Sequence, residues 1–138
     1  MEENVLIEEH QKLHVYGFGE TENGYSSESL LEVDVGYISN EECQTLYDPD
    51  IDYYGYASIT NSMMCADSSN EGKDSCKGDS GGPLIRKSSS NEEDMLVGVV
   101  SWGFGCATFP GVYSRISSQV GWIKEQVGDN SGTLPKYC

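Results

Sequence analysis

A serine enclosed by glycines is the most informative feature of this sequence. The segment Lys73–Pro83 reads KDSCKGDSGGP, and Ser80 lies between Gly78 and the pair Gly81-Gly82. Glycine lets the chain turn sharply and lets a substrate carbonyl approach the backbone, which nucleophilic acyl chemistry requires. Backbone N–H groups beside the serine can then converge on a developing oxyanion. The segment therefore predicts a serine nucleophile at Ser80.

Two kinds of hydrolase carry a serine in such a setting. The pattern Gly78-x-Ser80-x-Gly82 formally matches the nucleophile elbow of α/β-hydrolases, which needs an apolar strand before the serine and a helix after it. Here polar residues 74–77 precede the serine, and the following Gly-Gly-Pro opens a strand instead of a helix. The elbow is therefore the weaker alternative.

The segment instead resembles, across all of DSCKGDSGGP, the nucleophile signature of trypsin-like serine proteases of the chymotrypsin fold. The resemblance covers residues 13–127. GFGET at 17–21 resembles the family's Gly-Trp-Gly-x-Thr, SWGFGC at 101–106 and PGVYSRI at 110–116 resemble its pocket walls, and GWIKE at 121–125 resembles its C-terminal helix. The resemblance implies an all-β fold, namely the C-terminal six-stranded antiparallel β-barrel of the trypsin fold ending in an α-helix. Residues 1–138 would then be a partial peptidase domain without its N-terminal barrel.

Residue by residue, the resemblance implies a serine endopeptidase that cleaves after Lys or Arg. Ser80 matches the nucleophile, and the N–H groups of Gly78 and Ser80 match the oxyanion hole. Asp79 matches the aspartate that pairs with the new N-terminus after zymogen cleavage, a partner that this chain would lack. Asp74 matches the base of the primary specificity pocket, where a carboxylate pairs with a substrate Lys or Arg. The other matches to the substrate-binding walls and the substrate-pairing strand are Ser75, Ser101, Trp102, Gly103, Gly105 and Gly111.

Five cysteines indicate disulfides in an oxidising compartment, because irregular spacing without a C-x-x-C pair argues against zinc. The resemblance implies the pairs Cys43–Cys65 and Cys76–Cys106, and Cys138 is the candidate for the cysteine without a partner in the chain. Residues 1–12 are acidic and contain no apolar signal-peptide segment. We therefore expect a secreted protein from which N-terminal sequence is missing.

The acidic composition limits the partners. The net charge is −15, from 23 acidic and 8 basic residues, which argues against binding nucleic acid or an acidic membrane surface. No apolar stretch reaches the roughly 18 residues that a membrane span needs. The sequence suggests no cofactor and no metal site. The expected partners are peptides or proteins that contain Lys or Arg, together with the missing N-terminal barrel or chain.

The sequence offers no clear base for the serine, although a serine hydroxyl needs one at neutral pH. The resemblance places the base histidine and its orienting aspartate in the N-terminal barrel. The only histidines, His10 and His14, fall in the segment that would join the two barrels, and we expect them to be exposed linker residues. Three interpretations stay open: a partial chain of an endopeptidase, a non-catalytic half-protease that acts as a binding module, and an unrelated hydrolase.

Several short elements must position these residues. Alternating and apolar patterns predict strands at 12–17, 29–38, 62–66, 83–86, 95–102 and 111–116. Ser39 with Glu42 matches a capping box and predicts a short helix at 40–47, followed by a long loop at 48–61. Apolar residues at helical spacing predict a second helix at 118–127. The nucleophile would lie at the end of a loop at 67–82.

Overall fold

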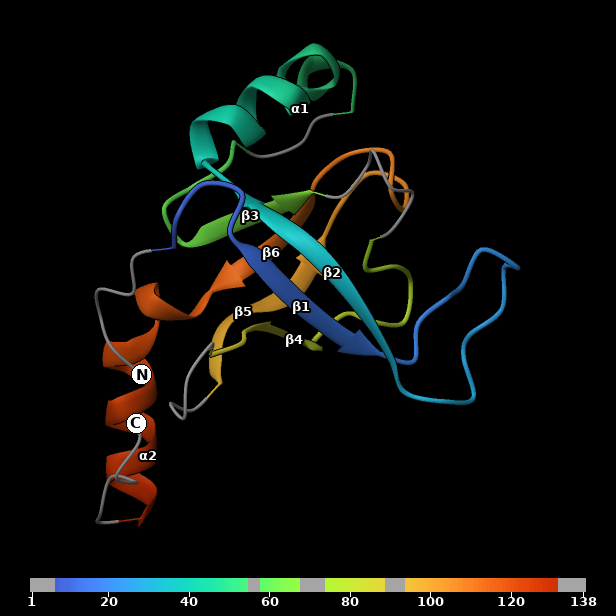
Figure 1. Cartoon of the computed structure of the whole chain (residues 1–138). Coiled ribbons are helices and arrows are strands. Elements are labelled where there is room, and N and C mark those ends of the chain that lie inside the picture. Colours follow the sequence, from blue (N-terminus) through green and yellow to red (C-terminus); the bar gives the residue numbers. More distant parts are fainter. Residues whose placement is uncertain (1–6, 55–57, 68–73, 89–93, 132–138) are drawn as a thin grey trace.

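Six strands form a closed barrel in which every neighbouring pair is antiparallel (Figure 1). The computed structural model describes residues 7–54, 58–67, 74–88 and 94–131. The strands follow one another around the barrel in the order β1-β2-β3-β6-β5-β4. The elements are β1 (Lys12–Gly17), β2 (Leu31–Ile38), α1 (Asn40–Tyr54), β3 (Met63–Asp67), β4 (Pro83–Arg86), β5 (Met95–Trp102), β6 (Gly111–Arg115), the 3-10 turn η2 (Ile116–Ser118) and α2 (Val120–Ser131). The predicted six-stranded barrel with a C-terminal helix is confirmed.

The strand patterns divide the side chains between the barrel interior and the outer surface. In β1, Leu13 and Val15 are fully or almost fully buried, whereas Lys12 is exposed, as the two-residue period of a strand requires. The interior is filled from all six strands. Its buried members are Leu13, Val15, Val35, Met64, Ala66, Leu84, Val97, Val100 and Tyr113.

Helix α1 is anchored to the barrel at its first two turns. Its N-terminus is capped as predicted, because the N–H of Glu42 donates to Oγ of Ser39. The N–H of Ser39, however, donates to Oε1 of Glu9 at 2.8 Å, so the second half of the cap comes from a residue before β1. Cys43 and Tyr47, one helical turn apart, are buried in a second apolar cluster under the helix.

The helix continues to Tyr54, so the predicted loop beginning at residue 48 is wrong over its first seven residues. Asp-Pro-Asp at 48–50 is typical of a turn, and proline inside a helix costs about 3 kcal/mol. The turns fixed by Cys43 and Tyr47 provide the nucleus, and each later residue extends the helix without a new nucleation cost. Nothing in the local sequence reports those tertiary anchors.

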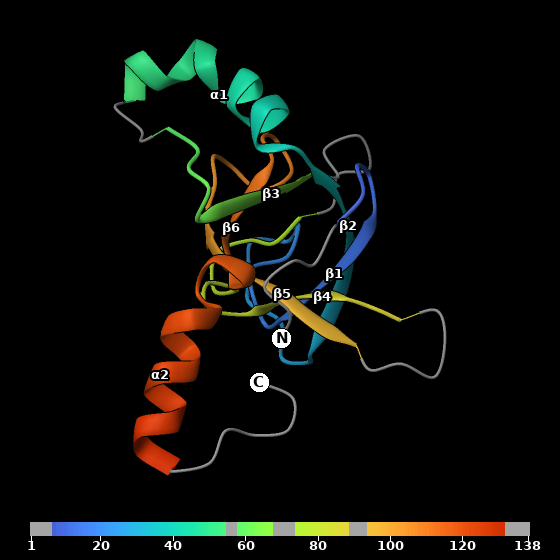
Figure 2. The same ribbon diagram turned by 90° about the vertical axis from the view of Figure 1, so that its left-hand side faces the viewer.

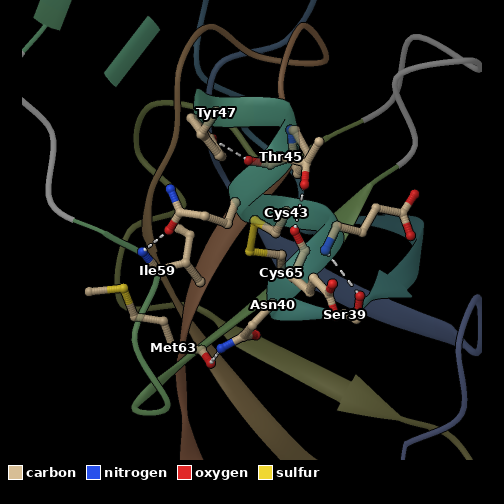
Figure 3. The surroundings of a disulfide bond; sticks show 12 residues. Ser39, Asn40, Cys43, Thr45, Tyr47, Ile59, Met63 and Cys65 are labelled. Atoms are coloured by element: carbon tan, nitrogen blue, oxygen red, sulfur yellow. Dashed lines mark hydrogen bonds between the residues drawn. A yellow bond between two sulfur atoms is a disulfide. The ribbon is translucent and has the colours of Figure 1, made fainter. Parts of the chain in front are cut away.

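A disulfide between Cys43 and Cys65 ties α1 to β3 (Figure 3). Two side-chain hydrogen bonds reinforce this connection. Asn40 donates from Nδ2 to the carbonyl of Met63 at 3.1 Å, and the N–H of Ile59 donates to Oε1 of Gln44 at 2.7 Å. The helix is therefore fixed to the strand and to the segment that leads into it.

Helix α2 leaves the barrel at η2 and projects beyond it, as the turned view shows (Figure 2). Val120 at its start is buried, and Trp122 is largely exposed. Among the described residues, no helix combines the length and the apolar character that crossing a membrane would require. Cys138 lies outside the described residues.

Candidate active site

Ser80 lies on an exposed turn that is fastened to β5. The chain reaches it through Gly78 and leaves it through Gly81, and both glycines have positive φ angles, 97° and 83°. A side chain would be strained at either position. The N–H of Gly81 donates to the carbonyl of Val100, and the N–H of Val100 donates to the carbonyl of Gly82, each at 2.9 Å. The serine is thus presented on a turn whose position the barrel sets.

The Asp79 carboxylate is held by two backbone donors. Its Oδ1 accepts the N–H of Gly19 at 2.8 Å, and its Oδ2 accepts the N–H of Cys76 at 2.9 Å. A Cβ atom at Gly17 or at Gly19 would overlap the Asp79 side chain, so the Gly-Phe-Gly segment is shaped around this carboxylate. The barrel itself therefore supplies two backbone donors to Asp79 that the sequence does not reveal, and the pairing of Asp79 with a new N-terminus stays a prediction.

Asp74 is partly buried and also accepts backbone hydrogen bonds. The N–H of Ser75 donates to its Oδ1 at 2.7 Å, and the N–H of Ala107 donates to its Oδ2 at 3.0 Å. Burial raises the pKa of Asp74 to about 6, although these N–H groups partly offset the loss of water. A buried carboxylate that is costly to ionise is suited to binding a cation that restores the lost solvation.

Asp74 and Ser80 line the same cavity, which has a volume of about 240 Å³. A Cβ atom at Gly111 would lie 3.2 Å from Oδ1 of Asp74, so a side chain there would crowd the carboxylate. All of the predicted substrate-binding residues contribute to the lining. They are Asp74, Ser75, Ser101, Trp102, Gly103, Gly105 and Gly111. In the described part of the chain, Gly78 and Asp79 lie outside this lining.

The second predicted disulfide, Cys76–Cys106, joins the nucleophile turn to the wall of this cavity. Both predicted pairings are thereby confirmed. At the same place the pairing of β5 with β6 shifts its register between Val100 and Trp102, which leaves Ser101 exposed at the cavity. A β-bulge bends a strand and redirects its side chains. The disulfide and the bulge together set the position of the wall.

Tyr47 supports the cavity wall from behind, a role that the sequence did not reveal. Its hydroxyl donates to the carbonyl of Pro110, directly before Gly111. Its ring lies 5.4 Å from the ring of Trp102 and 5.4 Å from that of Phe109. Burial raises the pKa of Tyr47 to about 12, so the hydroxyl stays protonated and remains a donor. The helical spacing from Cys43 was the one available signal, because both residues face the barrel.

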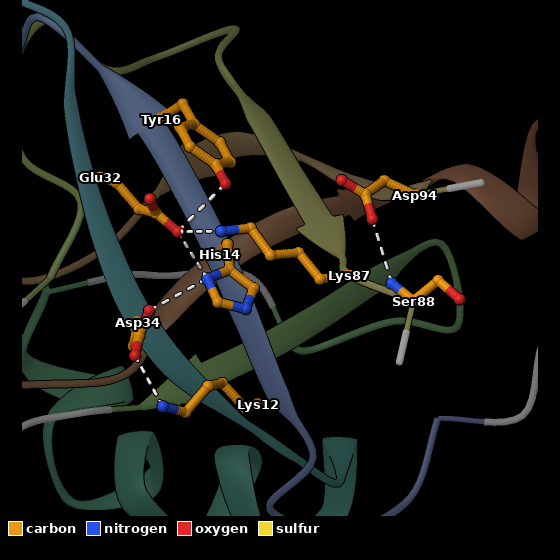
Figure 4. Close-up of polar contacts among 8 residues, drawn as sticks. All are labelled: Lys12, His14, Tyr16, Glu32, Asp34, Lys87, Ser88 and Asp94. Carbon is orange, nitrogen blue, oxygen red and sulfur yellow. Dashed lines mark hydrogen bonds and ion pairs between the residues drawn. The ribbon is translucent and has the colours of Figure 1, made fainter. Parts of the chain in front are cut away.

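The two histidines lie away from the cavity, since neither belongs to its lining in the described part of the chain. His10 is exposed, as expected. His14 is not an exposed linker residue, which corrects the expectation. It belongs to β1, its side chain is only 11% exposed, and its Nδ1 lies 2.8 Å from Oε1 of Glu32 (Figure 4). The linker interpretation failed because β1 begins two residues before His14 and pairs it with β2.

The closed six-stranded barrel carries a serine flanked by glycines and a carboxylate that line one cavity. This combination is typical of the chymotrypsin fold, and comparison with known proteins agrees. The sequence profile described as Trypsin matches residues 2–123, so the chain belongs to the trypsin family of serine proteases. It is 44% identical to Trypsin 5G1 of Aedes aegypti, over 84% of this chain and 40% of that protein. It is 45% identical to Trypsin-1 of Astacus astacus, over 80% of this chain and 44% of that protein.

A relative with a different kind of name also matches, at slightly lower identity. The chain is 40% identical to the Clotting factor G beta subunit of Tachypleus tridentatus, over 83% of this chain and 38% of that protein. The chain therefore spans less than half of the length of these relatives. Family membership is established, and the activity of the whole protein is a matter for proposal.

Proposed function

We propose that this chain carries the nucleophile and the primary specificity pocket of a secreted serine endopeptidase that cleaves after Lys or Arg. The observation that carries the proposal is the shared cavity of Ser80 and Asp74. A carboxylate and a nucleophile that line one cavity suit a substrate whose cationic side chain enters beside its scissile carbonyl. The two disulfides suit an oxidising compartment.

In this mechanism, Oγ of Ser80 attacks the scissile carbonyl carbon and gives its proton to a base. The N–H groups of Gly78 and Ser80 stabilise the resulting oxyanion. The base then protonates the leaving amine as the C–N bond breaks and an acyl-enzyme forms on Ser80. Water, deprotonated by the same base, hydrolyses this ester. Asp74 binds the substrate cation throughout, and the strand at Ser101–Gly103 pairs with the substrate backbone.

The base must come from outside residues 1–138 for this reaction to run. His14 is engaged by carboxylates on the outer face of β1 and β2, and neither histidine lines the Ser80 cavity in the described part of the chain. The matched relatives extend well beyond the aligned segment, which leaves room for a second barrel that supplies the base.

The alternative is a non-catalytic half-protease that binds cationic peptides. The absence of a histidine beside Ser80, in the part of the chain that the structure describes, favours it for residues 1–138 taken alone. A fluorophosphonate probe and a fluorogenic arginine substrate separate the two functions. We expect residues 1–138 to show little turnover and little labelling of Ser80, whereas a longer protein that supplies the base is labelled and active. Robust turnover by residues 1–138 would contradict this expectation.

Cleavage profiling of the longer protein on a peptide library tests the specificity. We expect cuts after Lys and Arg, loss of all cuts in Ser80→Ala, and loss of the preference for basic residues in Asp74→Ser. Asp94→Ser is the matched control, because Asp94 is an exposed aspartate outside the cavity lining. A preference of the unaltered enzyme for Phe or Leu would refute the assignment of Asp74.

A further inference from the structure

Three side chains on the outer face of β1 and β2 direct nitrogen and oxygen atoms at one point (Figure 4). Nδ1 of His14 lies 2.8 Å from Oε1 of Glu32 and 3.0 Å from Oδ1 of Asp34. The strand register explains the cluster, because His14 pairs with Asp34 and Glu32 follows two residues away on the same face. The histidine is nearly enclosed, and each carboxylate keeps 41% of its side chain exposed.

The single proton that Nδ1 of His14 can carry does not account for its contacts with both Glu32 and Asp34. Nδ1 of an imidazole carries at most one hydrogen, which points in the plane of the ring and can serve one acceptor well. Two carboxylate oxygens nevertheless lie within 3.0 Å of this one nitrogen. When the ring proton is on Nε2, three atoms with lone pairs face one another. A cation at their centre would bind all three.

We propose that His14, Glu32 and Asp34 form a binding site for Zn²⁺. An imidazole nitrogen and carboxylate oxygens are ligands that zinc accepts, and three protein ligands with water in a fourth position form a known tetrahedral arrangement. The three ligand atoms lie within 4.8 Å of one another. Tetrahedral bonds of about 2.0–2.2 Å separate neighbouring ligands by about 3.3–3.6 Å, so the side chains need to open by only roughly half an ångström. Calcium prefers six or more oxygen ligands, and the imidazole nitrogen therefore favours zinc.

Two neighbouring lysines, Lys87 and Lys12, contact the proposed carboxylate ligands and should affect zinc binding to different extents. Lys87 binds Oε1 of Glu32, the oxygen that faces His14, so its ammonium competes with the metal for that oxygen. The same ammonium lies 5.6 Å from the centre of the Tyr16 ring, which gives it a second place to stay. Lys12 binds Oδ2 of Asp34, the oxygen that faces away from His14. Removing Lys87 should therefore tighten zinc binding more than removing Lys12.

Sequence patterns alone do not predict this site, because positions 14, 32 and 34 do not have the spacing of a zinc motif. Only the pairing of β1 with β2 brings them together. A metal here would join the first two strands of the barrel by bonds between side chains. We therefore expect bound zinc to raise the thermal stability of the chain.

Calorimetric titration of ZnCl₂ into disulfide-bonded residues 1–138 tests the site, in a Cys138→Ser background that removes the cysteine predicted to lack a partner. We expect one zinc per chain and a rise in Tm. His14→Gln should weaken binding at least tenfold, and Lys87→Ala should tighten it more than Lys12→Ala does. His10→Gln is the matched control, because the chain has only two histidines.

The proposal would be overturned if the chain does not bind zinc, or if His14→Gln binds zinc as tightly as the unaltered chain. It would also be overturned if His10→Gln weakens zinc binding as much as His14→Gln does. If His14→Gln fails to fold by circular dichroism, Glu32→Gln replaces it with the same expected loss. Imidazole ¹⁵N spectra provide a direct readout, since zinc should shift the Nδ1 resonance of His14 and leave His10 unchanged. A matching response to CaCl₂ would also reject the proposed zinc chemistry.

Discussion

Two pairs of carboxylates in this molecule are held in opposite ways. Asp74 and Asp79 are partly buried and accept N–H groups of the backbone. Glu32 and Asp34 lie on an outer face and are bound by histidine and lysine side chains. Backbone donors are fixed by the barrel, whereas lysine side chains can turn away without disturbing the fold. The candidate active site is therefore preorganised, and the outer face can exchange one cation for another.

The largest effect should follow from Gly19→Ala. The new Cβ atom would overlap the Asp79 carboxylate that accepts the N–H of Gly19, so the carboxylate would lose a donor or the loop would move. We expect a loss of more than about 3 kcal/mol in the free energy of unfolding, measured with urea. The matched control is Gly121→Ala, whose Cβ atom meets nothing within 4 Å, and alanine should be neutral or stabilising in that helix. Equal stability of the two variants would show that Asp79 is not held rigidly.

Removing the disulfides one at a time should give the next largest effect. The pairs enclose similar sequence separations, 22 and 30 residues, so each double Cys→Ala variant should lose about 2–4 kcal/mol of stability. Binding of benzamidine, a small amidinium ligand, should separate them. Loss of Cys76–Cys106 releases the cavity wall and should weaken binding, whereas loss of Cys43–Cys65 should change it less. If calorimetry shows that loss of Cys43–Cys65 weakens benzamidine binding more than loss of Cys76–Cys106 does, the wall is positioned mainly through α1.

Asp74 should make the stability of the folded chain depend on pH. Its pKa is raised to about 6 in the folded chain from an ordinary value of 3.8, so the folded state binds the proton more tightly. Protonation of Asp74 therefore adds to the free energy of unfolding below pH 4, and this contribution is lost as the pH rises to about 6. Asp74→Asn should remove this loss, which we expect to be roughly 1–3 kcal/mol between pH 4 and pH 7.

Benzamidine affinity should run in the opposite direction, rising as Asp74 ionises and levelling off above pH 6. Asp94→Asn is the control for both measurements, because Asp94 is exposed and outside the cavity lining. If Asp74→Asn and Asp94→Asn have the same urea-unfolding profile across this range, burial does not disfavour the Asp74 charge.

Glu32→Gln should have the smallest effect on stability in the absence of zinc. Lys87 and the other partners of Glu32 hold its pKa below the usual range, but the carboxylate is solvent-exposed and its pairing is screened by salt. We expect a slight loss of thermal stability at low ionic strength that disappears in 0.5 M NaCl. A loss that persists in high salt would mean that this face is as rigid as the cavity.

The sequence predicted the barrel and the residues around the cavity well, for physical reasons. Strand alternation and apolar runs located β1, β4 and β5 closely, and the resemblance supplied their closure and both disulfides. The predicted substrate-binding residues line one cavity with Ser80. Their roles stay predictions until the activity is measured.

The features that the sequence missed all depend on contacts between distant segments. The extension of α1 beyond residue 47, the support of Pro110 by Tyr47 and the N–H donor from Gly19 to Asp79 each need the folded barrel. His14 was misplaced for the same reason, because its environment comes from β2. Local patterns report periodicity and turn chemistry, and they do not report which strands become neighbours.

The closure of the barrel through β1 and β4 also sets the order in which the molecule can fold. His14 pairs with Ile85 and Val15 pairs with Leu84, so the ring joins segments that are far apart in the chain. Pairings of this kind form slowly, on a scale of milliseconds to seconds, because the intervening chain loses its entropy first. The β1–β2 hairpin can form early, with open strand edges that attract other chains. Because Asp79, beside Ser80, accepts the N–H of Gly19 from the segment after β1, we expect the Ser80 turn to reach its final arrangement only after this closure.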